Sequence, residues 1–517
     1  MKDKNDERRL RSIQLIGFAL MSIATTAFCG DGESVRLPLV PYPQEVALGK
    51  GTFTPKQALG LKFSAGQAGI MPIAATFARD LSAIGFSAPQ GKAPPENPSS
   101  VVELSIGQDE QLGKEGYRLT IDSKVSIAAA TGEGLFWGTR TVLQLLQAGP
   151  GKAVPRLVIV DKPEFEYRGL MIDNARRFHS LDFHIQAIKR MSSFKLNRYQ
   201  IHFSDDQSYT LPSDIFAELP TKDRHYSREQ VRQLVAAGRE YHVMIVPEID
   251  VPGHSRALIE GIPSLKCANV PADKRTNKLC VGKEETYETL GKLFSEVMEM
   301  FPGQYWHLGA DEVRYGAPSC DACRKRMKDE KLADGDQLFH YFINRMHRFC
   351  KSKGRTMLVW EGFHPDRGPT VDKDIIVCPF DVTHKGLMPS DYFKAGYKTL
   401  NTAWSPLYVA DRLYMTTPEM LARWSPYMFG AGRSPQPLAY WKKFQPDSLK
   451  PDQIIGAQMC SWANEEKVEE GLLFGTGPGF FDYGRPGPRA PIMAERLWTG
   501  SKTNPKDLLE RVGQAYW

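Results

Sequence analysis

The stretch YRGLMIDNAR, residues 167–176, decides the fold class: an apolar strand at Gly169 to Asp173 runs straight into polar residues. This pattern of apolar run followed by polar cluster recurs at Tyr199 to Phe203, Val243 to Ile249 and Tyr305 to Gly309. Four later runs continue it: Thr356 to Trp360, Ile375 to Cys378, Thr399 to Ala403 and Ile454 to Met459. Helix-like segments such as Phe183 to Phe194 and Arg228 to Tyr241 lie between many of these runs, so residues 164–517 are predicted to form a (β/α)8 TIM barrel.

The region before the barrel has a different pattern of apolar and polar residues. Residues 36–160 contain short β-like segments separated by turns and an amphipathic stretch from Gly134 to Gln147. This predicts a small α+β domain, with Asp161-Lys162-Pro163 as the hinge to the barrel.

The first 29 residues have the layout of a secretory signal peptide. A basic segment ending at Arg11 precedes an apolar run from Ile13 to Phe28 and a polar stretch from Gly30 to Glu33. We therefore expect an exported protein, periplasmic or secreted, without a membrane span in the mature chain. A retained signal anchor is a less favoured alternative because the run is short for a bilayer span. Lipidation at Cys29 is disfavoured by Phe28, since a small residue normally precedes the modified cysteine.

The charge of the chain excludes some partners. Sixty-six basic and 60 acidic residues give a formal net charge of +6 over 517 residues, part of it from the extreme N-terminus. Such a balance argues against a nucleic-acid partner or an anionic membrane surface.

Polar clusters follow four successive predicted strands. They are Ser204 to Gln207, Pro247 to His254, His307 to Glu312, and Trp360-Glu361. In a barrel of this type, residues at the carboxyl ends of the strands meet at one mouth. Asp311 and Glu312 are adjacent, and their side chains can point in different directions and take different roles. We therefore expect a carboxylate-based active site at this mouth.

These motifs together resemble glycoside hydrolase family 20. The resemblance rests on residues 167–176, Lys195-Leu196-Asn197, His202 to Gln207, Pro247 to His254 and His307 to Val313, and it extends to Glu115-Gly116-Tyr117-Arg118-Leu119 and to Pro491 to Trp498. It implies an exo-acting, retaining β-N-acetylhexosaminidase that needs no metal or organic cofactor. In this family the acetamido oxygen of the substrate, rather than an enzyme carboxylate, attacks the anomeric carbon.

The resemblance also implies the catalytic roles. Glu312 is expected to be the acid and base, and Asp311 is expected to remain ionised and to orient the acetamido group. Asp205 and His254 are expected to form a hydrogen-bonded chain with Glu312.

The remaining expected site residues bind the sugar. Arg168 resembles the family's ligand for a sugar hydroxyl. The resemblance further predicts that Trp360, Trp404 and Trp462 line the pocket and that Tyr408 binds the acetamido carbonyl.

Two positions depart from the family pattern. The acidic residue expected two positions after Tyr408 is replaced by Ala410, with Asp411 one step later, and the glutamate expected two positions after Trp462 is replaced by Asn464, with Glu465 one step later. The run from Ile375 to Phe380 also lacks the family's usual tryptophan. These changes weaken the expectation of strict specificity for N-acetylglucosamine, since N-acetylgalactosamine, a 6-modified sugar or a disaccharide unit could be accepted.

Three other functions are alternatives. A lacto-N-biosidase-like enzyme is the nearest alternative. A non-catalytic glycan-binding relative is disfavoured because Asp311 and Glu312 are both present. A metal-dependent hydrolase using His254 and His307 is disfavoured because the sequence has no HExxH or comparably close ligand spacing.

Cysteines provide a separate signal. Cys267 and Cys280 bracket a polar loop, and Cys320-Asp-Ala-Cys323 forms a CxxC motif. A structural zinc site built from these pairs is one interpretation, and disulfides that staple the loops are the favoured one for an exported protein. Cys378 and Cys460 are predicted to be buried thiols.

Overall fold

The computed structural model describes most of the chain. The described residues are 36–63, 69–88, 101–271, 274, 276–313, 315–316, 320–381, 389–409, 417–430, 450–462, 473–474 and 488–514. The predicted signal peptide and the departures at Ala410, Asp411, Asn464 and Glu465 lie outside them. Among the described residues, no helix combines the length and apolar character needed to cross a membrane.

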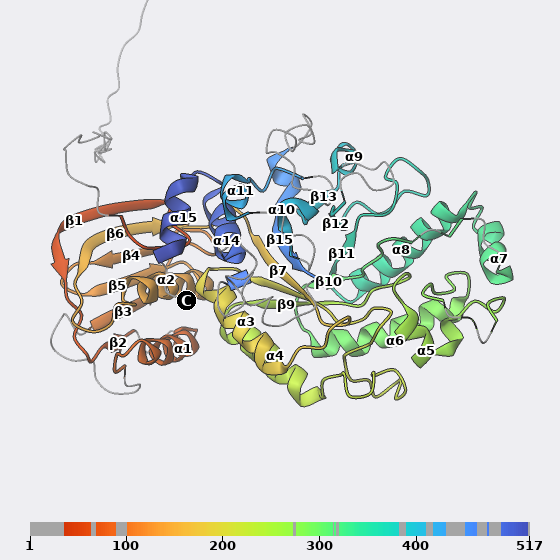
Figure 1. Cartoon of the computed structure of the whole chain (residues 1–517), viewed down its shortest axis with the longest axis horizontal. Coiled ribbons are helices and arrows are strands. Elements are labelled where there is room, and N and C mark those ends of the chain that lie inside the picture. The colour runs from red at the N-terminus through yellow and green to blue at the C-terminus, as the bar shows by residue number, and fades with distance from the viewer. Residues whose placement is uncertain are drawn as a thin grey trace, which may run out of the picture. The chain divides into compact units, whose positions relative to one another are not determined.

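The first part of the chain forms a six-stranded mixed sheet with two helices (Figure 1). The strand order is β1-β6-β4-β5-β3-β2, with α1 (Ile70–Ala83) and α2 (Gly132–Leu145) packed against the sheet. The strands are β1 (Glu45–Phe53), β2 (Gly60–Lys62), β3 (Val101–Ile106), β4 (Tyr117–Ile121), β5 (Val125–Ala129) and β6 (Val154–Asp161). This confirms the predicted small α+β domain.

Helix α2 lies unusually close to the sheet. The Thr131 side chain caps the helix by accepting from the Gly134 N–H at 3.2 Å. A Cβ at Gly138 would lie 2.5 Å from Ile127, so this position requires glycine. The close approach lets α2 cover the centre of the sheet with a fully buried apolar face.

The second part is a closed barrel of eight parallel strands, as predicted. The strands are β7 (Tyr167–Asp173), β8 (Arg198–His202), β9 (Met244–Glu248), β10 (Tyr305–His307), β11 (Thr356–Trp360), β12 (Ile376–Cys378), β13 (Lys398–Asn401) and β15 (Ile454–Ser461). Pairing of β13 with β15 and of β15 with β7 closes the barrel, and a short strand, β14 (Tyr408–Val409), pairs with the end of β15.

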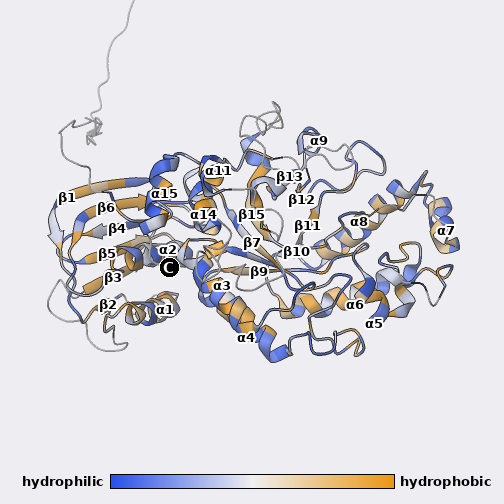
Figure 2. Ribbon diagram, in the orientation of Figure 1, coloured by the Kyte–Doolittle hydropathy of each residue, from blue (hydrophilic) through white to orange (hydrophobic). Residues whose placement is uncertain are grey.

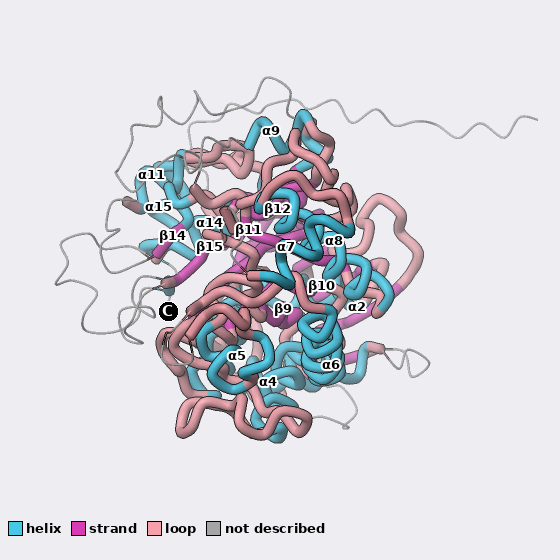
Figure 3. Tube along the Cα trace, turned by 90° about the vertical axis from the view of Figure 1, so that its right-hand side faces the viewer, coloured by secondary structure: helices cyan, strands magenta, loops and turns pink. Residues whose placement is uncertain are grey.

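Helices surround the strands, as Figure 3 shows. They include α3 (Leu181–Ser193), α4 (Arg228–Glu240), α5 (Arg256–Gly261), η2 (Pro263–Leu265), α6 (Glu284–Met300), α7 (Asp321–Asp329), α8 (Gly335–Ser352), α9 (Pro389–Lys394), α10 (Trp404–Leu407), α11 (Pro418–Arg423), η5 (Pro451–Gln453), α14 (Arg489–Thr499) and α15 (Pro505–Gln514). In α8, Leu338, Phe342 and Met346 recur at helical spacing and are buried. Such helices carry an apolar stripe toward the strands and polar residues toward solvent (Figure 2).

Buried polar contacts fasten the small domain to the barrel. Asp161, at the end of β6, accepts from the Tyr117 hydroxyl at 2.6 Å and from the Trp498 indole N–H at 2.8 Å, and the Lys195 ammonium lies 3.1 Å away. Asp161 was predicted to begin a hinge. Its buried carboxylate has partners from both parts, namely Tyr117 from the small domain and Lys195 and Trp498 from the barrel.

Candidate active site

The turn after β10 positions Asp311 and Glu312. Gly309, Ala310 and Glu312 all have positive φ angles, of 76°, 71° and 52°. A Cβ at Gly309 would lie 2.0 Å from the Asp250 carboxylate, so glycine is needed both for the backbone conformation and for the close approach. Asp250 also accepts from the Ala310 N–H at 3.1 Å. Strain of this kind is characteristic of functional turns.

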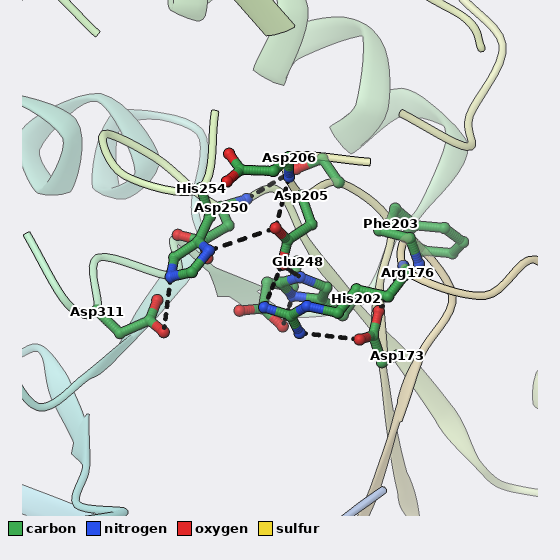
Figure 4. A network of polar contacts seen from close by, with 12 residues as sticks. Asp173, Arg176, His202, Phe203, Asp205, Asp206, Glu248, Asp250, His254 and Asp311 are labelled. Atoms are coloured by element: carbon green, nitrogen blue, oxygen red, sulfur yellow. Dashed lines mark hydrogen bonds and ion pairs between the residues drawn. The ribbon is translucent and has the colours of Figure 1, made fainter. Parts of the chain in front are cut away.

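His254 lies between Asp311 and Asp205 (Figure 4). Its Nε2 is 3.5 Å from Glu312 Oε2 and 3.7 Å from Asp311 Oδ2, and its Nδ1 is 3.3 Å from Asp205 Oδ1. Burial lowers the pKa of His254, but the carboxylates of Asp205, Glu312 and Asp311 outweigh it and raise the pKa to about 12. The imidazole is therefore a cation at neutral pH, with a carboxylate on each side.

Asp205 is held as an anion deep in the site. Burial raises its pKa, but hydrogen bonds from His202 and His254 and the charge of Arg176 hold the pKa well below its usual range. His202 Nε2 lies 3.0 Å from Asp205, and Arg176 Nη2 lies 2.6 Å from it. Asp205 thus links His254 to the ends of β7 and β8.

Asp206, the neighbour of Asp205, faces other partners. Its carboxylate lies 3.1 Å from the Arg256 guanidinium and accepts from the Asn277 amide at 3.4 Å. It therefore anchors the loop around α5.

Glu248 is a buried carboxylate that the sequence reasoning left without a role. It accepts from the Trp360 indole N–H at 2.7 Å and from Gln200 at 2.8 Å, and His202 Nδ1 lies 2.9 Å away. Burial raises the pKa of Glu248, yet His202 and His307 bring it well below its usual value. The signal available in the sequence was a glutamate inside an otherwise apolar strand, since buried charges are normally paired.

The four predicted aromatic residues lie together at the barrel mouth. Trp360 and Tyr408 have ring centroids 6.2 and 6.1 Å from that of Trp462, and Trp404 lies 5.9 Å from Tyr408. Phe380, the last residue of the run that lacks the family's usual tryptophan, packs with its ring centroid 5.9 Å from those of both Trp360 and Trp404. Burial raises the pKa of Tyr408 well above its usual value, with smaller effects of Cys460 and Asp311.

Arg168 does not belong to this site, and its predicted role as a sugar ligand is wrong. It is fully buried near the amino end of β7, whereas the site lies at the carboxyl ends of the strands. It donates to Glu115 and to the carbonyls of Phe165 and Lys195. These contacts join the small domain to the barrel and occupy the guanidinium.

Arg176, just past the end of β7, is the arginine that the structure brings to the mouth. It lies 2.9 Å from Asp173 and 2.6 Å from Asp205, and its guanidinium stacks 4.9 Å from the centroid of the Trp462 ring. Both arginines belong to the segment 167–176, and of the two only Arg176 reaches the mouth.

Three groups among the described residues of the mouth have the residue types of metal ligands. Within each group the ligand atoms lie within 4.8 Å of one another, and the groups are His202, Glu248 and Asp250; Asp205, Asp206 and His254; and Asp250, His254 and Asp311. In the first group Glu248 accepts from Gln200 and Trp360 and contacts His202. In the second group Asp205 and Asp206 are paired with Arg176 and Arg256. We interpret all three as parts of the hydrogen-bond network.

Comparison with protein families identifies the chain. The model described as "Glycosyl hydrolase family 20, catalytic domain" matches residues 165–501. The chain belongs to glycosyl hydrolase family 20. A second model, "Glycosyl hydrolase family 20, domain 2", matches residues 36–162.

Individual family 20 relatives share fewer than a third of their residues with this chain over the matched regions. A β-hexosaminidase of Porphyromonas gingivalis is 29% identical over 353 residues, covering 62% of this chain and 45% of the relative. A lacto-N-biosidase of Bifidobacterium bifidum is 26% identical over 393 residues, covering 72% of this chain and 33% of the relative. The chain thus spans less than half the length of these two relatives. The solved structure of a Flavobacterium johnsoniae chitobiase superimposes with a TM-score of 0.73 at 25% identity, covering 93% of this chain and 72% of that one.

Proposed function

We propose that this family 20 protein is an exo-acting β-N-acetylhexosaminidase that releases terminal β-linked N-acetylhexosamine with retention of configuration. The observation that carries the proposal is the position of His254 Nε2, within 3.7 Å of both Asp311 and Glu312 at the mouth of the barrel. An adjacent pair of carboxylates beside a cation and an aromatic wall suits hydrolysis of a glycoside bearing an acetamido group.

In the proposed mechanism Glu312 first acts as an acid. Its carboxyl proton goes to the glycosidic oxygen while the acetamido carbonyl oxygen of the substrate attacks the anomeric carbon, and the aglycone leaves as an alcohol. A water molecule then attacks the anomeric carbon, Glu312 takes the water proton, and the ring of the oxazolinium-type intermediate opens. Two inversions at the same carbon give net retention.

Asp311 has a different role in this proposal. Its carboxylate accepts a hydrogen bond from the acetamido N–H, which orients the carbonyl oxygen and offsets the positive charge that develops on the ring. Tyr408 would donate to the acetamido carbonyl, and the indoles of Trp360, Trp404 and Trp462 would enclose the N-acetyl group and the apolar face of the sugar.

His254 and Asp205 support the acid and base. Because His254 remains a cation between two carboxylates, proton exchange at Glu312 is coupled to Asp205 and His202. Arg176 would replace Arg168 as the arginine next to the sugar, held by Asp173 and Asp205.

The proposal is tested with aryl glycosides. Wild type is compared with Glu312→Gln and Asp311→Asn on p-nitrophenyl β-N-acetylglucosaminide and on the matching β-glucoside. We expect cleavage of the acetamido sugar alone, and losses of roughly 10²–10⁴-fold in kcat for each variant. Asp329→Asn, an exposed carboxylate of α7, is the matched control and should retain wild-type kcat. Equal cleavage of the β-glucoside would refute substrate assistance.

A lacto-N-biosidase-like activity is the second candidate. The run from Ile375 to Phe380 lacks the family's usual tryptophan, and Phe380 is the residue of this run that packs beside Trp360 and Trp404. One relative of this chain is named a lacto-N-biosidase. Faster release of a disaccharide than of a monosaccharide from p-nitrophenyl lacto-N-bioside would favour this candidate. The N-acetylgalactosaminide and 6-sulfated glycosides test the other departures from strict specificity.

A further inference from the structure

Four cysteines from two separate loops meet at one point in the structure. Cys267 and Cys280 belong to the loop between η2 and α6, Cys320 precedes α7, and Cys323 lies in the first turn of α7. One sulfur atom from each residue lies within 4.8 Å of all the others. Cys280, Cys320 and Cys323 are buried and Cys267 is partly exposed.

We propose that this tetracysteine cluster, Cys267, Cys280, Cys320 and Cys323, binds a structural zinc ion. The proposal concerns a site separate from the carboxylates and does not depend on the proposed enzymatic activity. Four thiolates and no open position are the ligand set of a structural rather than a catalytic zinc.

The spacing of the sulfur atoms fits a tetrahedral site. With zinc–sulfur bonds of about 2.3 Å, the edges of a regular tetrahedron are about 3.8 Å. Cys280 Sγ lies 3.6 Å from Cys320 Sγ and 3.9 Å from Cys323 Sγ. Cys280 is therefore at this distance from two partners at once, whereas a disulfide would join it to one partner at about 2.0 Å.

The backbone segments that carry the four cysteines are in direct contact. A Cβ at Gly282 would lie 2.4 Å from the backbone of Ala322 and of Cys323, so the two loops touch directly. The Cys280 N–H donates to the Leu265 carbonyl at 2.8 Å, and the Thr286 hydroxyl donates to the Cys280 carbonyl at 2.7 Å. Hydrogen bonds to its own backbone therefore hold Cys280 in place within the cluster.

The cluster is connected to the candidate active site. Leu279 N–H donates to the Pro252 carbonyl at 2.9 Å, two residues before His254, and the Tyr315 hydroxyl donates to the Leu279 carbonyl at 3.1 Å, three residues after Glu312. Zinc would therefore tie together the turns that carry His254 and Glu312. Its removal is expected to loosen these turns, because both contact Leu279, the residue next to the ligand Cys280.

The test measures metal content and thiol state of the full chain, expressed with its N-terminal segment and purified without chelator. We expect about one zinc per chain by plasma mass spectrometry. Zinc is displaced by a mercurial reagent, which caps the thiolates, and an excess of small thiol then takes the mercury and frees the cysteines. After removal of the small thiol, reconstitution with Co²⁺ should give the sulfur-to-cobalt charge-transfer band and visible bands of a tetrahedral tetrathiolate. Cys280→Ser and Cys323→Ser should lose the metal, while Cys350→Ala, a buried cysteine of α8, should keep it.

Two results would overturn the proposal. An intact mass lowered by the hydrogens of two disulfides, with no zinc, would mean that the four cysteines staple the loops covalently. Four titratable thiols in a metal-free, folded protein that does not take up Co²⁺ would mean that the cluster has no affinity for a metal. Both can be read from wild type alone, so neither depends on whether a variant folds.

Discussion

The Nη2 atom of Arg176 lies 2.6 Å from Oδ2 of Asp205, although the two residues follow different barrel strands. The same guanidinium contacts Asp173 and stacks on Trp462. Burial lowers the pKa of Arg176, but Asp173 and Asp205 raise it above its usual value, so the group is always charged. Arg176 therefore connects Asp205, the partner of His254, to Trp462 of the aromatic cluster.

Arg176→Lys should reduce activity with little effect on folding. An ammonium cannot bond to two carboxylates in a fixed plane and stack on an indole at the same time. We expect kcat/KM on the aryl N-acetylglucosaminide to fall about 10- to 100-fold, as for the loss of one charged hydrogen bond. Thermal unfolding should change little. Unaltered kcat/KM would remove Arg176 from the site.

Arg168→Met should lower stability and leave substrate binding unchanged. This change leaves Glu115 without its buried partner, which typically costs about 3–5 kcal/mol of folding stability. We expect a large fall in the urea midpoint, with KM of the folded fraction unchanged. A raised KM in a protein of normal stability would restore Arg168 as a sugar ligand.

Trp360→Phe should show the contribution of the indole N–H to Glu248. The ring volume is partly kept, but one oxygen of a buried carboxylate loses a donor at 2.7 Å. We expect a loss of roughly 1–3 kcal/mol in unfolding free energy, measured by urea denaturation, together with reduced kcat. Trp306→Phe, another buried tryptophan of the barrel, is the control for lost packing and should leave kcat near that of wild type.

His254→Gln should change both activity and the dependence of stability on pH. The pKa of His254 is raised from 6.5 to about 12 in the folded state, so its contribution to stability is complete below pH 6.5 and is lost progressively as pH rises toward 12. The difference in unfolding free energy between wild type and variant should therefore be larger at pH 6.5 than at pH 9.5. A difference that grows with pH would contradict a cationic His254.

The pH-rate profile gives a second readout for the same variant. Removal of a cation disfavours the ionised form of nearby carboxylates, so the basic limb should move to higher pH while kcat falls. A purely structural histidine would lower activity at all pH values without moving the limb.

Asp250→Asn should stabilise the protein increasingly as pH rises. Burial and the Asp311 charge raise the pKa of Asp250 well above its usual value, so wild type loses stability as pH rises above the unfolded value near 4. Asparagine keeps an acceptor for the Ala310 N–H without a charge to bury. Melting temperatures of both proteins from pH 4 to 9 check this, and a gap that shrinks with pH would contradict it.

The sequence by itself determined the fold class and the order of the barrel strands. All eight predicted strands are present because each is a short apolar run followed by polar residues, a pattern that depends only on local burial. The same pattern located the turns that carry Asp205, His254, Asp311 and Glu312, since the ends of parallel strands in a barrel share one face. The sequence also identified the four aromatic residues that the structure brings together.

Only the tertiary structure decided which residues face each other across strands. Arg168 lies near the start of β7 and Arg176 follows its end, eight residues later. The length of β7 therefore places Arg168 at the bottom of the barrel and Arg176 at its mouth. No local sequence pattern shows that Arg168 pairs with Glu115 and Arg176 with Asp205. The roles of Glu248 and Phe380 depend on side chains from other strands. The meeting of four cysteines likewise depends on how two loops, 40 residues apart at Cys280 and Cys320, fold against each other. Contacts between distant segments follow from closure of the barrel, which no single stretch of sequence encodes.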